Sequence, residues 1–497
     1  MKRESWLSWF LKGLILFGFV VLLGRTAELQ VIKGSYYRGL SEGNRIKRII
    51  IPAPRGQILA RGGQVLVGNR EVNSQWVRDY PLGSKFAHVG GYLGTANENE
   101  VGKIDPKCPE KGPYRANSLI GRSGLEQEYE CQLSGTDGEK LVEVDITGKE
   151  IRVLGTRSPI SGIDLKTSID YSFQTFVPDL MAGQKGAVVI TDTKGQVLAL
   201  YSSPSFDPQK VSDYLTDVNY PLFDRAIGGL FHPGSTFKPV VAIAGLMEGK
   251  IDKDYLYNDT GFIAVGASRF NNWYFTQYGS TEGEVNVVRA LTRSTDTFFY
   301  NLGGLLGAEK IASWAGKFGL GALTNIDLPG EVVNLIPTPE WKLKTTGERW
   351  YLGNTYNISI GQGDLAVTPI SLNAMIASIA SGGYLCSPKI NLAEKSDCQK
   401  LDIKKEYLDL VKQGMVGVCS VGGTGYTFFD FKIPIACKTG TAETSQDGKT
   451  HAWFTAFAPA DNPEIVVTVL FEQGGEGSKV AGPVTRKIFD YWNQNRQ

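Results

Sequence analysis

Ser235 and Lys238 are the residues of this chain whose types and spacing most directly suggest chemistry. They stand three positions apart in Pro233-Gly234-Ser235-Thr236-Phe237-Lys238, where the proline and glycine favour a helix start. Residues three apart on a helix share one face. A serine hydroxyl is a weak nucleophile until a base takes its proton, and a desolvated lysine can be neutral enough to do so. The pattern therefore predicts a serine nucleophile with a lysine base.

Two later motifs supply further groups of the same kind. Ser294-Thr295-Asp296 adds a second hydroxyl, and Lys438-Thr439-Gly440-Thr441 adds a second ammonium. We expect Ser294 to relay a proton and Lys438 to act as the second cation that lowers the pKa of Lys238. Asp296 is expected on the same wall of the site. Each motif alone is common by chance, but this order, with intervals of 59 and 144 residues, is typical of active-site serine acyl-transfer enzymes.

The third motif also has features that suit substrate binding. Thr439 and Thr441 offer hydroxyls to a carboxylate, and Gly440 is expected to let a substrate backbone approach. The alternation of apolar residues from Phe431 to Cys437 predicts that the motif ends a strand. An extended peptide could then pair with the edge of that strand.

The elements that must position these motifs follow a pattern of strands, helices and strands. Helices are expected over 238–248, which is apolar on nearly every face, and over 287–305, 370–380 and 483–492. Strands are expected over 186–191, 196–201, 433–436, 451–458 and 464–472. This order predicts an α+β fold with one antiparallel sheet, helices on both of its faces and an all-helical insertion that forms one wall of a cleft.

The N-terminal region differs from the rest of the chain. Trp6 to Gly24 is almost wholly apolar and follows Lys2 and Arg3, which predicts an uncleaved membrane anchor with a cytoplasmic N-terminus rather than a cleaved signal peptide. Residues 27–165 read as a strand-rich pedestal, in which arginines are expected to form buried pairs with carboxylates such as Glu126. The predicted domains are therefore 1–26, 27–165 and 166–497.

Composition argues against some classes of partner, but it does not decide whether the cysteines form disulfides. The formal net charge of +1 gives no overall field that would attract nucleic acid. Six cysteines lack metal-site spacing, so neither a metal nor another cofactor is expected. Cys108 with Cys131 and Cys386 with Cys398 could close disulfides, although buried free thiols are equally compatible with the sequence. Three histidines offer little for a Ser-His-Asp triad, and His232 is read as a positioning residue.

The motifs together resemble those of class B penicillin-binding proteins, which are membrane-anchored peptidoglycan D,D-transpeptidases. The resemblance covers nearly the whole chain. It rests on the serine, Ser-Thr-Asp and Lys-Thr-Gly motifs and on three further segments, which are Pro54-Arg55-Gly56-Gln57-Ile58, Gly121-Arg122-Ser123-Gly124-Leu125-Glu126 and Gly361-Gln362-Gly363. It implies a serine β-lactamase-like transpeptidase domain with a five-stranded sheet, carried on a dimerisation-type pedestal.

The resemblance also implies residue roles. Ser235 would attack the penultimate D-Ala of a stem pentapeptide, with Lys238 as base, Ser294 as relay and Lys438 as electrostatic partner. Asp296, Thr439, Gly440 and Thr441 would bind substrate, and the backbone N–H groups of Ser235 and Thr441 would form the oxyanion hole. β-Lactams would acylate Ser235. The product is a cross-link between neighbouring stems.

Location and partners are implied in the same way. The resemblance places the chain in the bacterial cytoplasmic membrane with an extracytoplasmic catalytic domain. The chain has no glycosyltransferase segment between anchor and pedestal, so a SEDS-family polymerase and other cell-elongation proteins are expected partners.

Two departures from the family pattern accompany the resemblance. Asp296 stands where asparagine is commoner, which favours the cell-elongation branch, and Ala60-Arg61-Gly62-Gly63 lacks an acidic residue that is frequent there. Two alternative functions are a β-lactam sensor or scaffold, and a hydrolase of the D,D-carboxypeptidase or β-lactamase type. The anchor and pedestal favour the transpeptidase over both.

Overall fold

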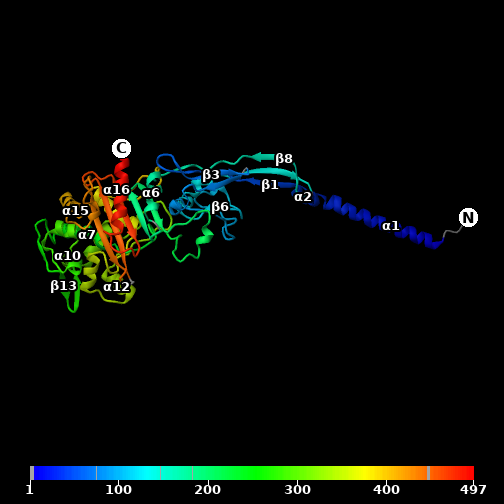
Figure 1. The fold of residues 1–497 in the computed structure, drawn as a ribbon. Coiled ribbons are helices and arrows are strands. Elements are labelled where there is room, and N and C mark those ends of the chain that lie inside the picture. The colour runs from blue at the N-terminus through cyan, green and yellow to red at the C-terminus, as the bar shows by residue number, and fades with distance from the viewer. Residues whose placement is uncertain (1–4, 74, 146, 182, 445–447, 497) are drawn as a thin grey trace. The chain divides into compact units, whose positions relative to one another are not determined.

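The computed structural model describes residues 5–73, 75–145, 147–181, 183–444 and 448–496 (Figure 1). The chain forms two compact units, each discontinuous in sequence. The first comprises Met1–Arg55, Glu71–Val77 and Ser134–Ile163. The second comprises Gly56–Arg70, Arg78–Leu133 and Asp164–Gln497. The sequence-based limits at residues 26 and 165 stay a prediction, because these units describe packing rather than evolutionary domains.

The first unit begins with the apolar helix expected from the sequence. Helix α1 spans Trp6–Ala27 with no buried residue, and a π-helical turn, Glu28–Ile32, continues it. Together they are long and apolar enough to cross a membrane. The unit also contains α2 (Gly34–Arg45) and an antiparallel sheet in the order β1-β7-β8, formed by Ile46–Ile51, Gly138–Val144 and Glu150–Arg157.

The second unit contains short elements before its main sheet. Its strands here are β2 (Ile58–Leu59), β5 (Leu93–Thr95), β6 (Leu119–Gly121) and β9 (Leu165–Lys166), and its helices are α3 (Ala87–Gly90), α4 (Gly124–Glu128) and α5 (Glu130–Leu133). Strands β3 (Val65–Val72) and β4 (Gln75–Asp79) follow β2 along the chain.

A buried ion pair lies among these short elements. Glu126 pairs with a buried arginine, as expected: Arg78 Nε lies 2.5 Å from Glu126 Oε1. Arg122 pairs instead with Glu100 at 2.7 Å. The sequence motif that contains both Arg122 and Glu126 therefore does not pair within itself.

The main sheet has five antiparallel strands in the order β11-β10-β20-β19-β18. Their bounds are Gly186–Thr191 for β10, Val197–Ser203 for β11, Ala436–Glu443 for β18, Thr450–Ala458 for β19 and Ile465–Phe471 for β20. Successive side chains of a strand point to opposite faces. In β19, Phe454 packs with the cluster under α6 (Tyr171–Met181) and α16 (Ala481–Asn495), whereas Trp453 packs with the opposite cluster. Helices on both faces explain why these strands are nearly continuous apolar runs.

The long insertion between β11 and β18 is mainly helical, as predicted. Its helices are α7 (Lys238–Met247), α8 (Trp273–Tyr278), α9 (Val287–Arg293), α10 (Asp296–Leu306), α11 (Ala308–Lys317), α12 (Pro339–Thr346), α13 (Leu352–Ser359), α14 (Pro369–Ala380) and α15 (Lys405–Val418). It also carries short strand pairs, which are β12 (Tyr257–Asp259) with β15 (Gly283–Val285), β13 (Phe262–Val265) with β14 (Ser268–Asn271), and β16 (Tyr384–Cys386) with β17 (Cys398–Lys400).

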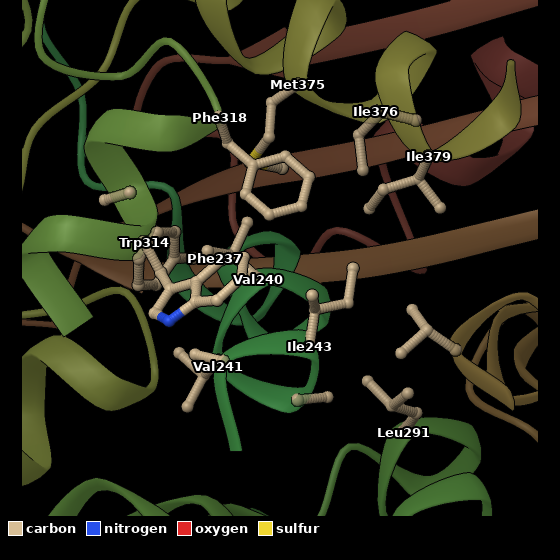
Figure 2. Close-up of a cluster of buried hydrophobic side chains, with 14 of the residues drawn as sticks. Phe237, Val240, Val241, Ile243, Leu291, Trp314, Phe318, Met375, Ile376 and Ile379 are labelled. Atoms are coloured by element: carbon tan, nitrogen blue, oxygen red, sulfur yellow. The ribbon is translucent and has the colours of Figure 1, made fainter. Parts of the chain in front are cut away.

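Helix α7 lies at the centre of this insertion (Figure 2). Val240, Val241 and Ile243 of α7 are fully buried, which is the expected position for a helix that is apolar on nearly every side. Figure 2 shows these side chains facing others from the neighbouring helices α9, α11 and α14. The same helix begins at Lys238, so the core of the insertion fixes the position of the first motif.

Candidate active site

The first motif lies in a tight turn that leads directly into α7. Residues Gly234–Phe237 form one turn of 3₁₀ helix, and α7 starts at Lys238. Residues three apart eclipse in a 3₁₀ turn, so Ser235 and Lys238 share a face, as predicted. Ser235 is partly exposed, whereas Lys238 is completely buried. Ser235 therefore keeps some contact with solvent, whereas the amine of Lys238 is shielded from water.

The second motif interrupts a predicted helix. The sequence predicted one helix over 287–305, but α9 ends at Arg293 and α10 starts at Asp296. Ser294 lies between them with φ of 57°, a left-handed conformation that costs a non-glycine residue about 1–2 kcal/mol. This break brings the Ser294 side chain and carbonyl oxygen to the lysines.

The hydroxyl of Ser294 lies between the lysine amines of the first and third motifs. Lys238 Nζ is 3.2 Å and Lys438 Nζ is 2.9 Å from Ser294 Oγ. Lys438 also donates to the carbonyl oxygen of Thr439 at 3.2 Å. A hydroxyl oxygen that accepts two N–H donors keeps its own proton available for a third partner. This geometry suits a group that passes a proton onward.

Asp296 approaches Lys238 more closely than the other groups do. Asp296 Oδ1 is 2.6 Å from Lys238 Nζ, and its Oδ2 accepts the backbone N–H of Trp273 at 2.9 Å. Burial lowers the pKa of Lys238, and Asp296 opposes that shift. Burial, together with the charge of Lys238, holds the pKa of Lys438 well below its usual value. Asp296 thus favours the ammonium form of Lys238, which the sequence did not predict.

Lys238 is hydrogen-bonded through Nζ to the second motif. Its Nζ donates to Asp296 Oδ1, to Ser294 Oγ and, at 2.8 Å, to the carbonyl oxygen of Ser294. Among the described residues, no hydrogen bond joins Nζ to Ser235 Oγ, although both side chains lie on one face. An ammonium has three N–H donors, and these three contacts use them. Lys238 must lose a proton before it can act as a base, and catalytic hydrogen bonds often shorten only when substrate binds.

The third motif lies on the edge strand of the main sheet. It occupies the middle of β18, which begins at Ala436, rather than the end of a strand that starts near Phe431. Because β18 is the outermost strand, its free edge can pair with an extended peptide, as expected. Thr441 is exposed, and its Oγ1 accepts the backbone N–H of Gly477 at 3.2 Å. Thr439 Oγ1 lies 2.8 Å from Thr424 Oγ1.

Gly440 lies against the turn that carries Ser235. A Cβ atom at this position would lie 2.9 Å from the carbonyl oxygen of Pro233 and 2.9 Å from Thr236 Cγ2. The close approach that Gly440 permits is therefore between β18 and the turn that carries Ser235. Its missing side chain makes room for this approach.

The sequence did not identify several residues around the site. Asn272 and Trp273 hold Asp296, although no recognisable motif contains them.

The cysteines form three disulfides. Cys108–Cys131 and Cys386–Cys398 are bonded, which is one of the two states that the sequence left open, and Cys419–Cys437 forms a further bond that was not expected.

His232 lies beside the turn that carries Ser235. Its Nδ1 lies 2.7 Å from the carbonyl oxygen of Leu365, and its own carbonyl oxygen accepts Trp453 Nε1–H at 2.8 Å. These contacts fit a positioning role rather than a base.

Known proteins are similar to this chain over most of its length. Residues 186–490 match the family "Penicillin binding protein transpeptidase domain", and residues 71–167 match "Penicillin-binding Protein dimerisation domain". The chain is 35% identical to the peptidoglycan D,D-transpeptidase MrdA of Acinetobacter baumannii over 463 residues, which cover 86% of this chain and 67% of the relative.

Solved structures match at similar coverage. The penicillin-binding protein PBP2 of Helicobacter pylori in complex with MreC superposes with a TM-score of 0.79 at 26% identity, covering 91% of this chain and 100% of that one. A chain of a peptidoglycan synthase complex that coordinates polymerization and crosslinking gives 0.77 at 28% identity, with 98% of both chains covered. The transpeptidase family covers more than half of the chain, and the similarity to MrdA identifies the branch. This chain therefore belongs to the class B penicillin-binding proteins, in the cell-elongation branch that includes MrdA and PBP2.

Proposed function

We propose that Ser235 is the acyl-carrying nucleophile of this penicillin-sensitive peptidoglycan D,D-transpeptidase. In the first step Ser235 Oγ bonds to the carbonyl carbon of the penultimate D-Ala of a stem pentapeptide. The amide bond to the terminal D-Ala breaks, and the serine proton ends on the amine of the released D-Ala. In the second step an amine of a neighbouring stem attacks the ester, forms the cross-link and returns a proton to Ser235. A β-lactam stops after the first step.

The observation that carries the proposal is the position of Ser294 Oγ between Lys238 and Lys438. Lys238 in its neutral form takes the proton of Ser235, and Ser294 passes a proton to the leaving amine. Ser294 Oγ accepts N–H groups from Lys238 at 3.2 Å and from Lys438 at 2.9 Å, so its own proton is available to the leaving amine. Lys438 supplies the electrostatic partner. The backbone N–H groups of Ser235 and Thr441 form the proposed oxyanion hole.

The proposed substrate contacts come from the edge strand β18, whereas Asp296 belongs to the lysine cluster. Thr439 and Thr441 are proposed to bind the substrate carboxylate, and the free edge of β18 pairs with the stem peptide. Gly440 supports this role indirectly, because it lets β18 approach the turn of Ser235. Both oxygens of Asp296 already accept N–H groups, so we assign Asp296 to Lys238 rather than to substrate.

The location and partners follow from the anchor and the relatives. We propose a single-pass protein of the bacterial cytoplasmic membrane, with α1 as its span, a cytoplasmic N-terminus and an extracytoplasmic catalytic domain. We propose domains 1–26, 27–165 and 166–497, and the family matches at 71–167 and 186–490 support the presence of a pedestal domain and a transpeptidase domain. A SEDS-family polymerase and other elongation proteins are the proposed partners. The similarity to structures of a synthase complex and of a complex with MreC supports this choice.

A reconstituted cross-linking assay tests the function. The full-length chain is mixed with a polymerase partner and with glycan that bears stem pentapeptides, and muropeptides are separated after digestion. We expect cross-linked dimers and released D-Ala with the parent protein and neither with Ser235→Ala. Penicillin labelling without any product would instead indicate a sensor. Released D-Ala without dimers would indicate a carboxypeptidase.

A further inference from the structure

Asp259 and Asn272 form a buried polar pair outside the three motifs. Asn272 is completely buried and Asp259 is 2% exposed. The Asp259 carboxylate accepts four hydrogen bonds, from Asn272 Nδ2 at 2.8 Å, Thr297 Oγ1 at 2.6 Å, the Gly261 N–H at 2.9 Å and the Glu282 N–H at 2.8 Å. A buried carboxylate with this many donors has a fixed orientation.

This fixed carboxylate determines how the Asn272 amide is turned. Both oxygens of Asp259 accept hydrogen bonds, so the NH₂ group of Asn272 must face Asp259. Asn272 Oδ1 then faces the backbone N–H of Asp296, at 3.1 Å. The reversed amide would place two acceptors against each other at Asp259 and two donors against each other at Asp296.

Asn272 thereby supplies a cap that helix α10 lacks locally. The N-cap residue Thr295 makes no side-chain capping bond, and its Oγ1 is buried without a partner. The first N–H groups of a helix need acceptors from outside the helix. Asn272 Oδ1 provides one from another segment, and the next residue, Trp273, donates its N–H to Asp296 Oδ2. Two adjacent residues thus hold the main chain and the side chain of Asp296.

We propose that Asn272, oriented by Asp259, is a positioning residue that keeps Asp296 Oδ1 against Lys238 Nζ. It does not touch the reacting atoms and acts only through Asp296. The inference rests on the proposed function, because Lys238 matters only if it is the base for Ser235. It adds to that function two residues, Asp259 and Asn272, which lie outside all of the sequence motifs.

Loss of this support has two expected consequences for Lys238. The carboxylate contact of 2.6 Å opposes the effect of burial on the lysine pKa. If Asp296 turns away, the pKa of Lys238 falls further, so the limb of the rate–pH profile that follows lysine deprotonation moves to lower pH. The amine also loses one of the contacts that fix its position, so the maximum rate falls.

The test compares acylation rates of full-length variants with a fluorescent penicillin from about pH 6 to about pH 10. We expect Asn272→Ala to react on the order of tenfold more slowly than the parent, with its limb displaced to lower pH. The matched control is Asn301→Ala. Asn301 also lies on helix α10, and its amide donates a hydrogen bond of 2.8 Å to the Tyr255 hydroxyl. This control should keep the parent rate and profile.

A second variant keeps the shape of the side chain. Asn272→Asp places a carboxyl against Asp259, and two such carboxyls share a proton because both cannot ionise at this distance. Its acylation should approach the parent at low pH and fall relative to the parent as pH rises through the raised pKa of the pair. This variant decides the question if Asn272→Ala does not fold.

Parent-like rates and pH profiles in both Asn272 variants would overturn the proposal. The failure of the proposed function would look different, because the unmodified protein itself would then not be labelled at Ser235.

Discussion

Lys438 Nζ lies 2.9 Å from Ser294 Oγ, an oxygen that Lys238 Nζ also contacts from 3.2 Å. Both lysines are completely buried, so water does not screen them from each other. Only Lys238 is paired with a carboxylate among the described residues of this cluster. The arrangement therefore stabilises charge on Lys238 and disfavours it on Lys438. Its consequences can be tested at each member.

Replacing Asp296 with asparagine tests what holds the proton on Lys238. The amide keeps an acceptor for Trp273 N–H but removes the negative charge, so the pKa of Lys238 should fall further. A base with a lower pKa is neutral at lower pH. We expect the rising limb of the penicillin acylation rate to shift to lower pH in Asp296→Asn. The comparison is Asp364→Asn, which removes the charge of one of two carboxylates beside Lys342 and should leave the limb in place. A limb unchanged in both variants would refute the role of Asp296.

Removal of the Ser294 hydroxyl tests the relay. Ser294→Ala should acylate about 10²-fold more slowly, because proton transfer by a positioned group typically contributes that much or more. The control is Ser378→Ala, which loses a buried hydroxyl bonded to the carbonyl oxygen of Met375 at 2.7 Å. Stopped-flow measurement of fluorescent penicillin acylation gives both rate constants. Equal rates for the Ser294 variant and the parent would exclude the hydroxyl from the proton path.

The disulfide beside the third motif is expected to support the site. Cys437 directly precedes Lys438, and its partner Cys419 ends helix α15. The loop that this bond closes contains Thr424, whose hydroxyl contacts Thr439 at 2.8 Å. We expect the double variant Cys419→Ser/Cys437→Ser to lose roughly tenfold in acylation rate as the loop and β18 loosen.

The bond between Cys386 and Cys398 provides the matched comparison. It joins β16 to β17, a strand pair that contains none of the three motifs. The double serine variant of this pair should also lower the melting temperature, since each bond restricts the unfolded chain and is worth about 3 kcal/mol. Its acylation rate should remain that of the parent. Equal losses of rate in both double variants would show that the effect is general destabilisation.

His451 is expected to make the protein sensitive to acid. Burial lowers the pKa of His451 to about 4, and its Nδ1 accepts the Gln473 N–H at 3.2 Å. The unfolded chain, with a pKa near 6.5, binds the proton first as pH falls. The free energy of unfolding should therefore decrease between about pH 6.5 and about pH 4. In His451→Gln this decrease should be smaller, as measured by urea unfolding at several pH values. Parallel pH curves for the two proteins would contradict the prediction.

Local patterns predicted the elements and motifs of the fold well. Apolar residues on nearly every face of 238–248 correctly predicted a central helix, and β-branched runs located the strands of the main sheet. The order of the motifs and the family resemblance also predicted that Ser235, Ser294 and Lys438 belong to one site. Periodicity could not find the break at Ser294, because its left-handed φ depends on tertiary contacts and no glycine or proline marks it.

Contacts between distant segments were beyond local patterns. Asn272 and Trp273 contact Asp296, which pairs with Lys238, and they precede Asp296 by more than 20 residues. The bond between Cys419 and Cys437 likewise needs the fold to bring a helix end to an edge strand. Sequence spacing gives candidates for chemistry, but the charge state of each candidate depends on neighbours that spacing does not reveal.

Peptide mapping of the penicillin adduct tests the role of Ser235 most directly. The full-length protein is incubated with penicillin, digested and analysed by mass spectrometry, alongside Ser235→Ala. One adduct on the peptide that contains Ser235 is expected in the parent, and none in the variant. An adduct on Ser294, or an adduct that persists in Ser235→Ala, would contradict the assignment of the nucleophile.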